Sequence, residues 1–377
     1  MIPVNEPRLD GRELEYVSEC LNTGWISSAG RFISEFEDSW AARCNRRYGV
    51  AVCNGTVALQ LAVAALNLGP GDEVIMPSFT IISCAMAVVY QGALPVLVDA
   101  DPVTWGMDVA AVAARITPRT RAIMPVHIYG HPVDMDPLLE LAKKHGLAII
   151  EDAAEAHAAQ YLSHRDGPDP EWRVCGSFGD VSCFSFYANK LVTTGEGGMV
   201  VTDDEALAKR LRLLRNLAFV PSQRFLHDEL GFNFRMTNVQ AAIGLAQVER
   251  IDETVVRKRR IGARYLEALG SLPGIRWQVE QPWAKSVWWM NGFVLEKGTG
   301  HTAVSMADRL KLLGVETRPF FLGMDREPAL RERGLFAGET YPITTELADM
   351  GLYLPSGVGL TEEQQETVIT AVNQVLA

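Results

Sequence analysis

Short apolar runs alternate with helical patterns between residues 49 and 202. Such runs lie at residues 50–53, 147–150, 180–186 and 199–202, and each is nearly free of charge. Uncharged apolar runs of this length are typical of strands buried on both faces of a parallel sheet. The alternation therefore predicts an α/β fold with a mostly parallel central sheet covered on both faces by helices.

The region from residue 74 to residue 98 carries no charge. A membrane span needs about 20 predominantly apolar residues, but this region contains Pro77, Gly92 and Pro95 together with several hydroxyl groups. A buried strand, helix and strand explain the pattern better. We expect no membrane association from this segment.

Residues 238–262 form one long helical pattern. It separates a predicted large domain (residues 1–250) from a smaller C-terminal α+β domain (residues 251–377). The smaller domain has strand candidates at residues 287–295 and 315–321 and helix candidates at residues 301–313 and 361–376.

Amino-acid composition and net charge indicate which kinds of partner the protein is expected to bind. The chain has 377 residues, 48% of them apolar, and a net charge of −11, which argues against a nucleic-acid partner or an anionic membrane. The basic runs at residues 210–215 and 257–260 fall in helical patterns and predict solvated helix faces. Six scattered cysteines without a Cys-x-x-Cys pair predict reduced thiols and no metal site, and the chain opens without a charged-then-apolar leader, so we expect a cytoplasmic protein.

Lys190 is the first candidate for chemistry. It follows the strand-like run 180–186 and precedes the glycines at 195, 197 and 198 and a second strand-like run at 199–202. Apolar surroundings would lower its pKa and supply the free amine that a Schiff base with a carbonyl cofactor needs. A surface lysine in a connector is an equally good interpretation of this segment alone.

Asp152 is the second candidate, because it follows the uncharged run 147–150 directly. Ligands of open α/β sheets bind at the carboxyl ends of the strands. A carboxylate there could keep the pyridine nitrogen of pyridoxal 5′-phosphate (PLP) protonated. The alternative is an aspartate that caps the next helix, which accounts less well for the adjacent Glu151. His127 also follows a strand-like run, and a place near the cofactor and a structural role both fit it.

Gly55 and Thr56 form the third candidate. They lie between the strand-like run 50–53 and an apolar helical pattern at residues 57–66. A glycine turn at a helix N-terminus offers free N–H groups to a phosphate, although Thr56 is also an ordinary N-cap residue. The chain lacks complete dinucleotide and P-loop motifs, which argues against those phosphate ligands.

These motifs, taken together, resemble the DegT/StrS family of PLP-dependent sugar aminotransferases. The resemblance runs from Arg8 to the C-terminus and rests on Asn-Gly-Thr at 54–56, Pro-Ser-Phe-Thr at 77–80, Glu-Asp-Ala-Ala-Glu-Ala-His at 151–157, Ser-Phe-x-x-x-Lys at 185–190, Thr-Gly-Glu-Gly-Gly at 194–198 and Gly-x-Asn-x-Arg-Met at 231–236. It implies a fold-type-I PLP enzyme.

The resemblance also implies a role for each motif residue. Lys190 would form the Schiff base and shuttle the proton, and Asp152 would partner the pyridine nitrogen. Phe79 would stack on the cofactor ring, and Glu155 would lie beside the ring oxygen. The phosphate would be held by Gly55, Thr56 and Ser185. Asn233 would reach the phosphate of a second subunit, which implies a homodimer with shared active sites.

Within the family, the chain most resembles enzymes that aminate C4 of a GDP-linked 4-keto-6-deoxyhexose, with L-glutamate as the expected donor. Three segments depart from that pattern. Residues 322–325 read Leu-Gly-Met-Asp where two histidines are expected, residues 162–174 look like an inserted surface loop, and residues 214–219 are unusually apolar. Another ketosugar or a keto-cyclitol therefore stays open as substrate. A sugar 3-dehydratase fits less well because Lys190 is present, and the acidic charge argues against a non-catalytic regulatory protein.

Overall fold

The computed structural model describes residues 1–220, 223 and 225–377. Within these residues, seven strands form a central sheet, and only β9 runs against the others. In sheet order the strands are β1 (Tyr48–Val52), β9 (Gly198–Thr202), β8 (Val181–Ser185), β5 (Ala148–Asp152), β4 (Thr120–Ile123), β2 (Glu73–Pro77) and β3 (Leu94–Val98). The mostly parallel sheet predicted from the apolar runs is confirmed.

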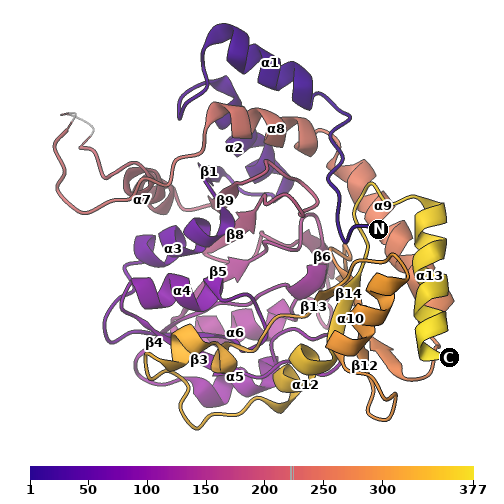
Figure 1. Cartoon of the computed structure of the whole chain (residues 1–377). Coiled ribbons are helices and arrows are strands. Elements are labelled where there is room, and N and C mark those ends of the chain that lie inside the picture. Colours follow the sequence, from indigo (N-terminus) through magenta and orange to yellow (C-terminus); the bar gives the residue numbers. More distant parts are fainter. Residues whose placement is uncertain (221–222, 224) are drawn as a thin grey trace.

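Helices cover both faces of this sheet, as Figure 1 shows. One face packs against α3 (Gly55–Ala65) and α4 (Ser83–Tyr90), and the other against α5 (Val109–Arg115) and α6 (Met135–His145). Side chains alternate between the faces along each strand. In β5, Ile150 joins the core under α3 and α4, whereas Ile149 joins the core under α5 and α6. The same alternation sends the carboxylates of Glu151 and Asp152 to opposite faces.

The uncharged region 74–98 forms β2, α4 and β3, as expected from its prolines and glycine. All five residues of β2 are buried, which explains why the strand needs no polar face. Among the described residues, no helix is both long and apolar enough to cross a membrane.

Three helices pack together beside β1 and β9, at the edge of the central sheet. They are α1 (Glu13–Thr23), α2 (Arg31–Arg43) and α8 (Asn238–Val248). The described residues between α7 (Glu205–Arg215) and α8 project from the body of the molecule (Figure 1).

The expectation of one long helix over residues 238–262 is wrong, because α9 (Ile251–Leu269) begins separately after a break at Glu249 and Arg250. Contacts with the N-terminal region hold that break. Glu249 accepts a hydrogen bond from the Tyr16 hydroxyl, and Arg250 pairs with Asp10.

The C-terminal part has its own core and, within the described residues, its own four-stranded antiparallel sheet. Its strands, in sheet order, are β10 (Ile275–Trp277), β12 (Asn291–Leu295), β14 (Gly351–Leu354) and β13 (Arg318–Pro319). Its helices are α9, α10 (Ala303–Leu312), α11 (Pro328–Arg331), α12 (Pro342–Met350) and α13 (Glu362–Leu376), and it has a short 3-10 turn at Met324–Arg326. A second 3-10 turn, at Ile128–Gly130, lies in the large domain. The strands expected at residues 287–295 and 315–321 are shorter than predicted. Residues 287–290 are irregular instead.

The inserted segment 162–174 is not a plain surface loop. Residues at both of its ends pair as a hairpin of β6 (Gln160–Ser163) and β7 (Glu171–Val174), and β11 (Ala284–Lys285) adds a third strand. Pro and Gly density predicted the turn correctly but hid the strands, because only residues 164–170 form the tip.

Candidate active site

A cavity of about 630 Å³ lies at the carboxyl ends of the central strands, where the large domain meets the C-terminal part. Six of the residues expected at a PLP site line it, namely Gly55, Thr56, Asp152, Glu155, Ser185 and Lys190. They come from three separate stretches of the chain, and the parallel sheet brings them to one edge.

Lys190 ends a turn after β8, and only 9% of its side chain is exposed, so it is not a surface lysine. Its ammonium nitrogen lies 3.7 Å from Oε1 of Glu155 and 3.4 Å from the centre of the Trp289 ring. Burial lowers the pKa of Lys190, while Glu155 and Asp152 act in the opposite direction. The buried amine therefore loses its proton more readily than an exposed lysine does.

Asp152 ends β5 and is 3% exposed. Its two carboxylate oxygens accept hydrogen bonds from the Cys84 thiol and from the backbone N–H of Ala154, both at 3.1 Å. Residues 153–159 form turns, so Asp152 does not cap a helix. Burial raises the pKa of Asp152, because a carboxylate in this apolar place lacks a full countercharge.

Glu151 points to the other face of the sheet and serves the structure. Its carboxylate accepts hydrogen bonds from Nε2 of His127 at 2.9 Å, from the Ser182 hydroxyl at 2.8 Å, and from the backbone N–H groups of residues 176, 178 and 179. Burial alone would raise the pKa of Glu151, but these donors outweigh it and lower the pKa to about 2. Glu151 thus fixes the loop that leads into β8.

His127 does not lie at the cavity. The backbone N–H of Val133 donates to its Nδ1 at 3.0 Å, so the ring proton is assigned to Nε2, which donates to Glu151. Of the two interpretations open from the sequence, the structural one fits this geometry.

Gly55, Thr56 and Ser185 form a narrow cradle at the start of α3. A Cβ on residue 55 would lie 2.5 Å from Cβ of Ser185, so only glycine permits this approach. Asn54, not Thr56, caps α3, because its side chain accepts from the N–H of Val57 at 3.0 Å. The Thr56 hydroxyl is hydrogen-bonded to that of Ser83 at 2.9 Å.

Two of the expected site residues lie elsewhere. Phe79 is fully buried in an aromatic cluster with Tyr129, Phe320 and Phe321 and is not part of the cavity wall, so the structure does not place it to stack on a cofactor ring. Ile81, two residues on, is in the wall. Asn233 is exposed and is absent from the wall of its own chain's cavity.

Some wall residues carried no signal in the sequence. Trp289, Phe321 and Tyr353 close the cavity from the C-terminal part. Each is an aromatic residue in a segment without a distinctive motif, and such a residue is more often core. The altered stretch 322–325 contributes no residue to the wall, although Phe321 directly before it does.

The residues present fit PLP by their chemistry. The buried Asp152 lacks a full countercharge, and a protonated ring nitrogen would supply one. The cradle around Gly55 offers the free N–H groups of an 11-residue helix to a phosphate. Lys190 presents a buried amine in the same cavity. The aldehyde, the ring nitrogen and the phosphate of PLP would thus each have a residue of matching chemistry in this cavity.

Residues 7–373 match the sequence model of the DegT/DnrJ/EryC1/StrS aminotransferase family. The match covers nearly the whole chain, and the chain belongs to this family. It is therefore a PLP-dependent aminotransferase.

Known proteins are similar to the chain over its whole length. The chain is 46% identical to the GDP-perosamine synthase of Caulobacter vibrioides, over 100% of this chain and 98% of that protein. It is 40% identical to the GDP-perosamine synthase of Escherichia coli O157:H7, over 99% and 98%. The crystal structure of the aminotransferase TlmJ from Streptoalloteichus hindustanus matches with a TM-score of 0.90 at 32% identity, covering 100% and 99%. The expected aminotransferase fold is confirmed.

Proposed function

We propose that the enzyme transfers an amino group from L-glutamate to C4 of a GDP-linked 4-keto-6-deoxyhexose. The observation that carries the reaction type is the meeting of Lys190, Asp152 and the Gly55 cradle in one cavity. The choice of sugar and nucleotide is supported by full-length likeness to two GDP-perosamine synthases.

When bound, PLP supplies an electron sink for the electron pair left behind as a carbon loses its proton. The chain's own residues do the rest. Nζ of Lys190 takes the proton from one carbon and returns it to another. Asp152 holds a negative charge where the ring nitrogen needs one, and the Gly55 cradle holds the phosphate end in place.

Glu155 assists Lys190 from the same cavity. Its Oε2 accepts from the N–H of Tyr129 at 2.7 Å, which leaves Oε1 directed at the Lys190 amine. Burial raises the pKa of Glu155. The two groups therefore titrate together, and Glu155 can steady the ammonium form of Lys190 when it carries the proton.

A substrate panel tests the proposed sugar. The enzyme is first loaded with an amino group from L-glutamate, freed of glutamate, and then mixed in single turnovers with ketosugars that differ in nucleotide or in keto position. Loss of the loaded cofactor's absorbance reports amination. We expect the GDP-linked 4-ketosugar to react at least tenfold faster than its dTDP-linked counterpart. Equal rates across the panel would refute the proposed specificity.

A second candidate is another ketosugar or a keto-cyclitol. The observation that favours it is the altered stretch at residues 322–325, which follows the wall residue Phe321 directly and lacks both histidines expected there. The same panel, extended with a keto-cyclitol, decides between the two candidates.

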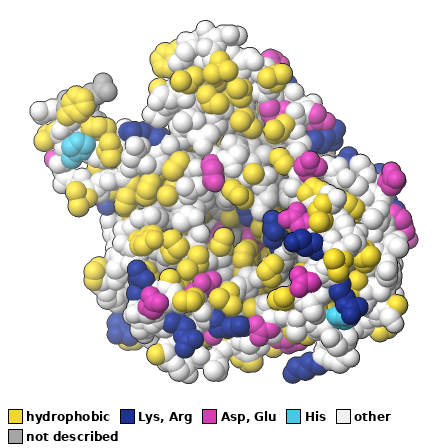
Figure 2. Space-filling view, in the orientation of Figure 1, with side chains coloured by type: hydrophobic (Ala, Val, Ile, Leu, Met, Phe, Trp, Pro, Cys, Tyr) yellow, Lys and Arg dark blue, Asp and Glu magenta, His cyan; other side chains and the backbone are white. Residues whose placement is uncertain are grey.

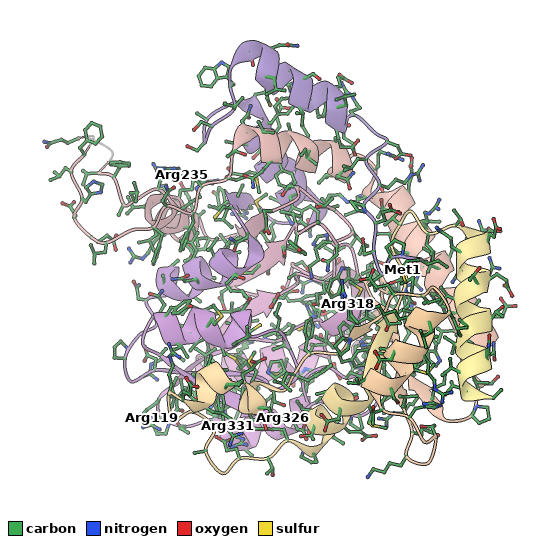
Figure 3. All side chains as sticks on the ribbon, viewed as in Figure 1. Met1, Arg119, Arg235, Arg318, Arg326 and Arg331 are labelled. Atoms are coloured by element: carbon green, nitrogen blue, oxygen red, sulfur yellow. The ribbon has the colours of Figure 1, made fainter. Side chains whose placement is uncertain are left out.

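The active site is proposed to be shared in a homodimer. Asn233 lies outside its own cavity wall and is exposed, so it can serve a phosphate only in another copy of the chain. Figure 3 places Arg235 of the same motif near the base of the projecting segment. That segment and α1 present exposed apolar side chains, including Leu230 (96% exposed) and Leu14 (79%), which a second copy would cover (Figure 2).

Two further proposals concern the domain boundary and the location of the protein in the cell. We place the domain boundary after residue 250, because the separate core of the C-terminal part draws on residues from 261 onward. A cytoplasmic location is supported by six cysteines that are all free thiols.

A further inference from the structure

Lys258 contradicts the expectation of a solvated basic face on α9. It is 1% exposed, although its neighbours in the run 257–260 pair with acidic groups or carbonyls at the surface. In the described part of the chain no carboxylate pairs with Lys258. Burial lowers its pKa to about 7. A lysine buried without a countercharge needs a structural reason to be there.

Two backbone carbonyls provide that reason. Nζ of Lys258 donates to the carbonyl oxygen of Trp289 at 2.8 Å and to that of Ser356 at 2.5 Å. Two N–H bonds suffice for these acceptors, so the contact persists whether or not Lys258 carries its third proton. Lys258 thereby fixes the irregular segment that holds Trp289 in the cavity wall.

Trp289 is in turn bound to the turn that carries Lys190. Its indole Nε1 donates to the carbonyl oxygen of Asn189 at 2.8 Å, and the same oxygen accepts from Nδ2 of Asn5 at 3.1 Å. Its ring lies beneath the Lys190 amine, 3.4 Å from the ring centre to Nζ. One side chain thus holds both the backbone before Lys190 and the amine itself.

We infer that Trp289 is a positioning residue for Lys190, and that Lys258 holds Trp289 in place for this task. The face of the indole ring defines where the amine rests whenever it is free of the cofactor. The hydrogen bond from Nε1 fixes the position of the turn that carries Lys190. This inference rests on the proposed function, because it assigns Lys190 to the cofactor.

The ring also acts on the proton affinity of Lys190. An aromatic face attracts a cation, so Trp289 favours the charged amine, as do Glu155 and Asp152. Burial opposes them. Removing the ring should therefore lower the pKa of Lys190 by about one unit, since a desolvated contact of this kind is of that strength.

The first test measures this pKa in the full-length protein freed of cofactor. Only the neutral amine reacts with acetic anhydride, so labelling of the Lys190 peptide across a pH series reports its pKa, with the exposed Lys144 as internal reference. We expect Trp289→Leu to lower the pKa by about one unit, which raises labelling about tenfold at a pH below both values. Trp288→Leu is the matched control, because Trp288 is equally buried (4%) but Trp289, not Trp288, lines the cavity and lies under the Lys190 amine.

The second test uses a smaller change, in case Trp289→Leu does not fold. Trp289→Phe keeps a ring face but loses the hydrogen bond from Nε1. In this variant we expect the backbone amide of Lys190 to exchange with deuterium at least fivefold faster than in wild type or in Trp288→Phe. The inference is overturned if the Trp289 variants match their Trp288 controls in both readouts. Neither readout needs a sugar or a donor, so a wrong substrate assignment would leave this result untouched.

Discussion

Asp152→Asn is the most informative single change in the site. It removes a negative charge and keeps the shape of the side chain. The Ala154 N–H can still donate to the amide oxygen, and the Cys84 sulfur can accept weakly from the new amide nitrogen. Because burial raises the pKa of Asp152, the carboxylate is costly in the ligand-free protein. We therefore expect the variant to fold with equal or greater stability.

Catalysis should fall sharply. An opposite charge in contact raises the pKa of a ring nitrogen by about 1–3 units, and Asp152 is only 3% exposed, so water screens the pair little. One unit corresponds to about 1.4 kcal/mol. If the transition state depends on the protonated ring, the loss is about 1.4–4 kcal/mol, or roughly 10- to 1000-fold in rate. Stopped-flow absorbance of the half-reaction with L-glutamate measures it directly.

Glu151→Gln is the matched control, since the two carboxylates are adjacent, both buried, and directed to opposite faces of β5. The pKa of Glu151 falls from 4.5 to about 2, which corresponds to roughly 3 kcal/mol of stability. That stability is fully present above pH 4.5 and is lost as the pH falls toward 2. We expect Glu151→Gln to lower the urea midpoint and to keep the half-reaction within about threefold of wild type. A half-reaction of Asp152→Asn within threefold of wild type would refute the assignment of Asp152.

The other predictions concern the lysine, the cradle and the shared site. Lys190→Ala should abolish turnover but still bind PLP by absorbance titration, and more than about a thousandth of the wild-type rate would exclude it as proton shuttle. Gly55→Val should weaken PLP binding at least tenfold, because its side chain meets Ser185, whereas Gly69→Ala, with its nearest neighbour 3.6 Å away, should bind PLP normally. Inactive Lys190→Ala and Asn233→Ala proteins should regain partial activity when mixed and allowed to exchange subunits, because one site of each mixed dimer keeps both residues. If mixed dimers form and stay inactive, Asn233 does not serve a second subunit.

Much of the site was accessible from the sequence because its signals are local. A strand end is marked by the residue at which an apolar run stops, and this places Asp152 and Lys190 at the sheet edge. The close approach at Gly55 follows from a glycine between strand and helix. The role predicted for Asn233 stays a prediction, because it requires a second subunit, which one chain does not contain.

The sequence by itself determined the mostly parallel sheet and the order of the motifs, and it predicted roles for Lys190 and Asp152, since each of these signals depends on neighbours within a few positions. Only the tertiary structure decided which side chains form the cavity around these residues. Phe79 turned into the core while Ile81 reached the cavity. Trp289 joins Asn189 across 100 positions of the chain, and Lys258 is buried although its sequence neighbours are charged. The physical reason is that hydrophobic periodicity indicates which side of a single helix or strand is buried. Contacts of this kind depend instead on how two separately formed sheets and their helices pack against each other.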